Sequence, residues 1–136
     1  MKHLRIAALA ALFSAVVSVF DGAAFAAEVA SGDWDVQKKR ISGTWSIVEK
    51  DDGRYVVLSD DFKTRRAPDL KIFLSMRVAK DVTKRNATAG TFIGELKSAK
   101  GGQSLKIPEG VNLDDFSSLV LHCEQYTVLW GAADLR

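Results

Sequence analysis

Short runs of alternating apolar and polar side chains make up much of this 136-residue chain, and this period of two is typical of β-strands with one buried face. The clearest runs are 41–48 and 70–75, where Leu70, Ile72 and Leu74 share one side of the strand. Glycine and proline residues separate the runs, and no run after the N-terminal apolar segment carries a helical stripe. The sequence therefore predicts a single all-β domain of about seven strands, an antiparallel β-sandwich or a partly closed barrel.

Two groups of turn residues predict chain reversals. Asp51-Asp52-Gly53 divides residues 41–59 into two strand-like runs, so we expect a hairpin in which the glycine takes a positive φ. Gly101-Gly102 lies between 92–97 and 104–107, which predicts a second hairpin-like reversal.

The remaining segments are less regular. The polar stretch 79–91 predicts a mobile loop, and 113–116 predicts a single helical turn. Two apolar runs near the C-terminus, 118–123 and 126–130, predict either one bent strand or two strands. We expect one shared core, to which the following residues contribute: Trp45, Ile47, Leu70, Ile72, Leu74, Leu119, Leu121 and Val128.

Residues 1–26 have the pattern of an export signal peptide. A positively charged start precedes an apolar run over 6–20, and Ala24-Phe25-Ala26 is a small-x-small cleavage pattern. The apolar run has about 15 residues, short of the roughly 20 that span a bilayer, so a cleaved signal is favoured over a stable membrane anchor. We expect an exported mature domain over 27–136, periplasmic or extracellular.

Cleavage before Ala27 is directly testable, because it sets the first residue of the mature protein. We expect N-terminal sequencing of the protein recovered from outside the cytoplasm to begin at Ala27. A full-length chain retained in the membrane would contradict the prediction and favour an uncleaved anchor.

The charge distribution argues against a nucleic-acid partner. The formal charge of +2 includes the basic residues of the leader, so the mature domain is close to neutral. The basic clusters at 38–40, 65–66 and 84–85 are short, and we expect them to be solvated loops and edges.

Metal and cofactor chemistry is limited by the scarcity of ligands. Cys123 is the single cysteine, and beyond the leader His122 is the single histidine. Blue-copper, c-type haem and structural zinc sites all need more cysteine or histidine ligands than this. Adjacent residues of a strand also point to opposite faces, so these two side chains cannot share one ion. We therefore expect no metal site, and no cofactor held by the chain's own histidine and cysteine.

Cys123 is nevertheless the candidate functional residue. It shares a strand face with Leu119 and Leu121 and is followed by the polar pair Glu124-Gln125, so we expect it near a sheet end. A thiol at such a rim can meet a partner or an oxidant. With no second histidine as a base, we do not expect this thiol to be the nucleophile of a self-contained enzyme.

Several blocks in order along the mature chain carry a family resemblance; they are 41–47, 58–62, 67–75, 93–97, 101–103, 107–108 and 116–135. Together they resemble the DM-thirteen domain, a small module described as an electron-transfer domain and found beside DOMON domains in Skeletor-type proteins. The resemblance implies that Cys123 is the redox residue, acting with a partner protein or an external cofactor. The chain departs from the family at His122, where many members have tryptophan, and at Leu105, where an aromatic residue is common.

Two other functions stay open from the sequence. A non-catalytic interaction module of the cell envelope would use Cys123 as a small apolar core residue, since free cysteines are often buried. A disulfide-linked dimer is the third alternative, because an odd cysteine in an oxidising compartment can pair with a second chain.

Overall fold

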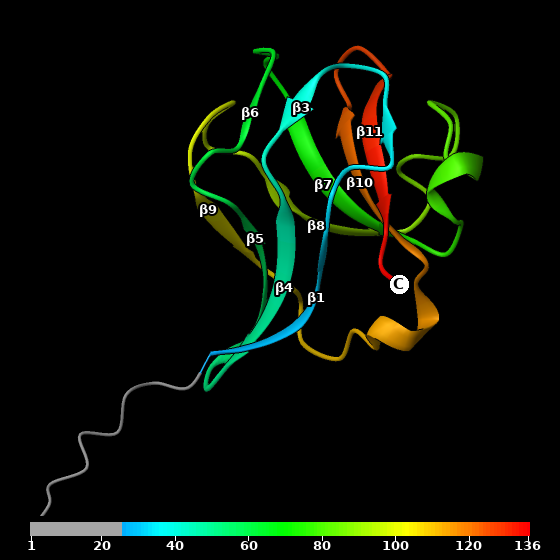
Figure 1. Cartoon of the computed structure of the whole chain (residues 1–136). Helices are drawn as coiled ribbons and strands as arrows, with labels where there is room; N and C mark the ends of the chain where they lie inside the picture. Colours follow the sequence, from blue (N-terminus) through cyan, green and yellow to red (C-terminus); the bar gives the residue numbers. More distant parts are fainter. Residues whose placement is uncertain (1–25) are drawn as a thin grey trace, which may run out of the picture.

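The computed structural model describes residues 26–136, which form eleven strands and two short 3₁₀ turns, with no α-helix among them (Figure 1). The strands form three antiparallel sheets. The first sheet has the order β1 (Ala27–Gly32), β4 (Trp45–Lys50), β5 (Gly53–Leu58) and β9 (Gln103–Lys106). The second has the order β2 (Val36–Gln37), β11 (Val128–Asp134), β10 (Ser118–Cys123), β7 (Leu70–Ser75) and β8 (Thr91–Glu95). A small third sheet pairs β3 (Ile41–Ser42) with β6 (Lys63–Thr64).

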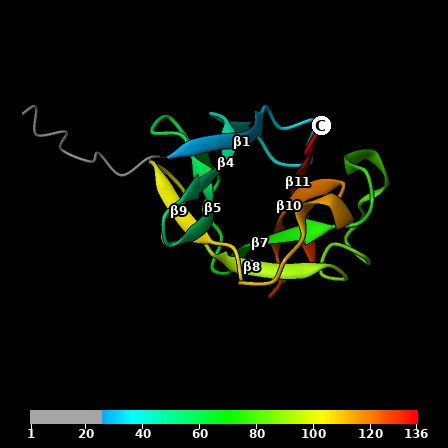
Figure 2. The same cartoon turned by 90° about the horizontal axis from the view of Figure 1, so that it is seen from below.

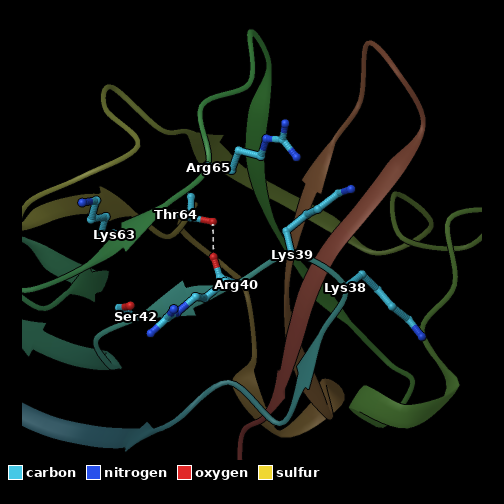
Figure 3. Close-up of a pocket in the computed structure, with 7 residues that line it drawn as sticks. All are labelled: Lys38, Lys39, Arg40, Ser42, Lys63, Thr64 and Arg65. Atoms are coloured by element: carbon cyan, nitrogen blue, oxygen red, sulfur yellow. Dashed lines mark hydrogen bonds between the residues drawn. The ribbon is translucent and has the colours of Figure 1, made fainter.

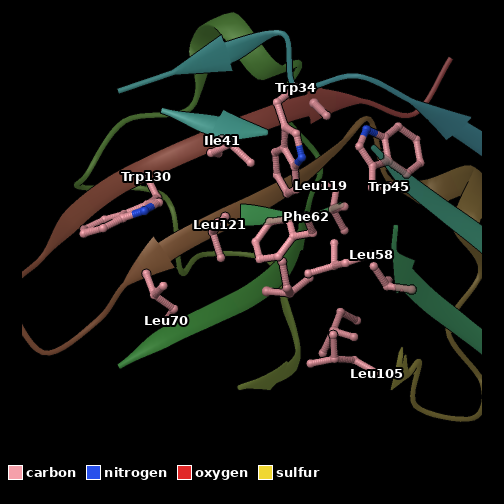
Figure 4. Packing of buried hydrophobic residues seen from close by; sticks show 14 of the residues in the cluster. Trp34, Ile41, Trp45, Leu58, Phe62, Leu70, Leu105, Leu119, Leu121 and Trp130 are labelled. Atoms are coloured by element: carbon pink, nitrogen blue, oxygen red, sulfur yellow. The ribbon is translucent and has the colours of Figure 1, made fainter. Parts of the chain in front are cut away.

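The two larger sheets face each other across one apolar core (Figure 2). Side chains from both sheets point into it, including Trp45 and Leu58 from the first and Leu119 and Leu121 from the second (Figure 4). Seven of the eight predicted core residues are buried there, and Val128 is partly buried against the same cluster. No sheet formed by the described residues closes on itself, so the all-β prediction is confirmed with open antiparallel sheets.

The predicted first hairpin is confirmed, but its first strand begins at Trp45 rather than at Ile41. β4 and β5 pair antiparallel, and Gly53 has a φ of 135°. Ile41 and Ser42 leave this hairpin and pair with β6 instead. Gly43 causes the break, because its φ is 84° and a Cβ there would lie 2.8 Å from the Phe62 backbone.

The second predicted hairpin is wrong. β8 pairs with β7 in the second sheet, whereas β9 pairs with β5 in the first. The glycine pair at 101 and 102 therefore lies in a connection that crosses from one sheet to the other, rather than in a tight turn within one sheet. Local turn chemistry predicts where the chain bends, but the packing of the sheets decides which strand it joins.

The stretch predicted as a mobile loop packs against the outer face of the second sheet. It begins with the 3₁₀ turn η1 (Ala79–Asp81), and Ala79, Val82 and Ala87 are all buried. The Ala79 N–H also donates to Asp134 Oδ1 at 2.7 Å. Three spaced apolar residues are enough to dock the segment, while its polar residues remain exposed. This layer covers an outer face that contains Phe73, Val120, Leu129 and Ala132.

The C-terminal region is one helical turn followed by two strands. The predicted turn is η2 (Leu113–Asp115), and β10 and β11 are separate antiparallel strands. The exposed turn 124–127 joins them, and Thr127 in it has a φ of 51°.

The predicted signal peptide lies outside the described residues, except for its last residue. Among residues 26–136, no helix is both long enough and apolar enough to cross a bilayer.

Leu121 provides a direct test of the shared core. It is fully buried in β10 and lies opposite Ile72 of β7 and Gly131 of β11. We expect Leu121→Ala to lower the free energy of unfolding by about 2 to 5 kcal/mol, because it removes buried methyl groups and leaves a cavity. Urea denaturation measures the loss.

Met76→Ala is the matched control, because its side chain is 69% exposed. We expect this substitution to change stability by less than about 0.5 kcal/mol. Equal small losses for both variants would mean that β10 does not face the core.

Candidate functional site

The candidate site lies at the end of β10, a strand that is buried along its whole length. β10 runs between β7 and β11, so it has a hydrogen-bonded neighbour on each side. Leu119, Leu121 and Cys123 face the shared core, whereas Val120 faces the outer layer. The expected strand face of the cysteine is therefore confirmed.

Cys123 is the last residue of β10, opposite Leu70 of β7 and Val128 of β11. Its place at a sheet end agrees with the sequence expectation. The expected exposure of the thiol at a rim is wrong, because the Cys123 side chain is 0% exposed. The reason is the position of β10 inside the sheet: β7 and β11 flank the thiol on both sides, and its side chain belongs to the shared apolar core.

The turn 124–127, which follows Cys123 in the chain, is held by a carboxylate and a lysine. Asp69 receives the backbone N–H of Gln125 on its Oδ2 at 2.8 Å, and its carbonyl receives that of Glu124 at 3.2 Å. Lys71 Nζ lies 2.9 Å from Glu124 and 3.1 Å from Asp69. Its hydrogen bonds to these two carboxylates raise the pKa of Lys71, and the bond to Glu124 has the larger effect. The turn is exposed, and these contacts tie it to the beginning of β7.

His122 is buried and cannot act as a base for the thiol. It is 1% exposed, and its Nδ1 has no hydrogen-bond partner among the described residues. Burial lowers the pKa of His122 below its ordinary value of 6.5, and this outweighs the opposing effect of Glu124 and Asp69. As its neighbour in a regular strand, the imidazole points away from Cys123.

The described residues offer the thiol no metal partner. Residues 26–136 contain no group of three or more histidine, cysteine, aspartate and glutamate side chains placed to hold an ion. The sequence also has no second cysteine. Any redox reaction of Cys123 therefore needs a group from another molecule.

A second feature, which we call the basic groove, lies where β3 and β6 pair (Figure 3). It has a volume of about 670 Å³ and is lined by Lys38, Lys39, Arg40, Ser42, Lys63, Thr64 and Arg65. Lys38–Arg40 and Arg65 belong to two of the basic clusters that we expected to be solvated loops and edges. The apolar Ile41, which is buried beside them, was the only local sign that one segment is anchored.

Comparison with known proteins identifies a domain family. The family model described as "Electron transfer DM13" matches residues 35–135, which is more than half of the chain and includes Cys123. No curated protein and no solved structure gave a significant match.

His122 predicts how stability depends on pH. Since its pKa is lowered in the folded protein, the unfolded chain binds the proton more readily. We therefore expect the free energy of unfolding to fall as the pH falls through 6.5 and below, with no contribution at higher pH. Urea denaturation over a pH series measures this dependence.

His122→Leu is the informative variant, because leucine fills a similar space and does not titrate. We expect its free energy of unfolding to decline less steeply as the pH falls than that of the wild type. Both proteins contain the same carboxylates, so the difference between the two slopes comes from His122. Identical pH profiles for the two proteins would contradict a buried neutral imidazole.

Proposed function

Because the chain belongs to the electron transfer DM13 family, we propose that it is an exported redox module in which Cys123 is the residue that changes oxidation state. The family match over residues 35–135 is the observation that carries this proposal. The position of the thiol at the end of β10 supports it, since the exposed turn 124–127 follows it directly in the chain.

The chemistry available to a lone thiol defines what the partner must supply. As a thiolate, Cys123 can attack a disulfide of a partner molecule: a mixed disulfide forms, the partner's S–S bond breaks, and its second sulfur leaves as a thiolate, so the partner disulfide is the electron acceptor. An external cofactor could take the place of that acceptor. Neither group comes from the chain itself, so the proposed module works only as part of a larger electron-transfer system.

Access to the thiol requires local opening. Cys123 is fully buried in the closed structure, whereas the turn beyond it is exposed and held through Asp69 and Lys71. Exposed turns at strand ends open at a lower free-energy cost than the core. We propose that a partner reaches the sulfur when this turn opens.

One observation favours a different function. A thiol that is 0% exposed in an apolar cluster also fits a purely structural role, in which the domain is a non-catalytic interaction module of the cell envelope. A disulfide-linked dimer would need the same opening of the turn in two chains.

Alkylation kinetics and a serine variant separate these functions. We expect the native thiol to react slowly, and Asp69→Ala to speed the reaction about tenfold, because the turn loses hydrogen bonds to a charged group. Asp60→Ala is the matched control, since Asp60 is an exposed aspartate that does not bind this turn.

Cys123→Ser should remain folded, with a stability loss of about 1 to 3 kcal/mol from burying a hydroxyl, and should abolish redox exchange with the partner. Loss of stability alone, with unchanged behaviour in the cell, would favour the structural role. A dimer band that appears only on non-reducing gels would instead identify an intermolecular disulfide.

A further inference from the structure

We propose that the basic groove binds a ligand that presents several phosphate groups. The inference does not depend on the proposed role of Cys123 and is argued from other residues. It rests on the number of cationic side chains around the β3–β6 pair, on the absence of ion pairs to them among residues 26–136, and on the groove that they line (Figure 3).

The backbone of the groove is held by specific contacts. Ile41 lies opposite Thr64 and Ser42 opposite Lys63, which joins two segments more than twenty residues apart. The Thr64 hydroxyl donates to the Arg40 carbonyl at 2.8 Å and accepts the Trp130 indole N–H at 2.9 Å. Because the core and the second sheet anchor both walls, the groove is present before any ligand arrives.

The groove gathers five cationic side chains without neutralising them; they are Lys38, Lys39, Arg40, Lys63 and Arg65. Four of the five are exposed, and among residues 26–136 no carboxylate lines the groove and none of the five forms an ion pair. Lys39 Nζ is placed 5.8 Å from the centre of the Trp130 ring. Like charges that line one groove repel one another, and a bound anion relieves that repulsion.

Phosphate fits this arrangement better than carboxylate does. Arg40 and Arg65 can each donate two parallel hydrogen bonds to an oxyanion, and the lysines act as mobile point charges. A phosphate monoester carries between one and two negative charges and three acceptor oxygens. A few phosphate groups therefore carry enough negative charge to balance the five cationic side chains of the groove. The volume of about 670 Å³ admits a small ligand of that kind.

Calorimetric titration of the purified protein with inorganic tripolyphosphate tests the proposal. The double variant Lys63→Gln/Arg65→Gln removes one lysine and one arginine from the groove. The control Lys84→Gln/Arg85→Gln makes the same change on the exposed outer layer. We expect the groove variant to bind at least about tenfold more weakly, the control to bind like the wild type, and added salt to weaken binding.

Unchanged denaturation midpoints would show that both double variants are folded, and Cys123→Ser should bind tripolyphosphate normally. Equal weakening by the two double variants would mean diffuse charge attraction and would overturn the site. Citrate binding as tightly as tripolyphosphate would overturn the preference for phosphate.

A further arm identifies the source of the phosphates. Vesicles that contain phosphatidic acid are compared with neutral phosphatidylcholine vesicles. Groove-dependent binding to the acidic vesicles would identify a lipid headgroup, and binding to tripolyphosphate alone would identify a free oligophosphate. Binding of neither probe would refute the proposal.

Discussion

The packing of β10 between β7 and β11 is the contact on which the rest of this structure depends. All six residues of β10 are buried, and its two faces serve two different layers. Leu119 and Leu121 meet the first sheet, while Val120 meets the docked segment on the outer side. Removing this strand would separate both layers at once, because each depends on burying apolar surface against it.

If Cys123 has the proposed redox role, the same packing sets the stability of the core against access to the thiol. A thiol in the centre of a sheet is shielded from solvent and from any partner, whereas one in an open loop would lack support. Placing it at the last position of β10 is a compromise between these limits. In the proposed function, the Asp69 and Lys71 contacts set how often the sulfur is reached, since they hold the turn that follows it.

The basic groove has a structural origin in the irregular strand β3. Gly43 separates Ile41 from the first sheet, and Gly131 leaves room for the Ile41 side chain, where a Cβ would lie 2.6 Å from Ile41 Cδ1. Ile41 therefore anchors the segment in the core while Lys38 and Arg40 before it remain exposed. Pairing with β6 then adds a second set of cations. An apolar anchor beside charged neighbours makes this surface better ordered than a flexible basic loop.

The sequence by itself determined the strand class, the facing of the core residues and the position of Cys123 at a strand end, because the period of two and the turn residues are local properties. It also determined the family through the order of its blocks. Only the tertiary structure decided that β8 and β9 join different sheets, that residues 79–91 dock on an outer face, and that the thiol is fully buried. It likewise brought Lys38–Arg40 and Lys63–Arg65 to one groove. Strand partners and burial depend on which distant surfaces meet, and no local pattern in the chain encodes that choice.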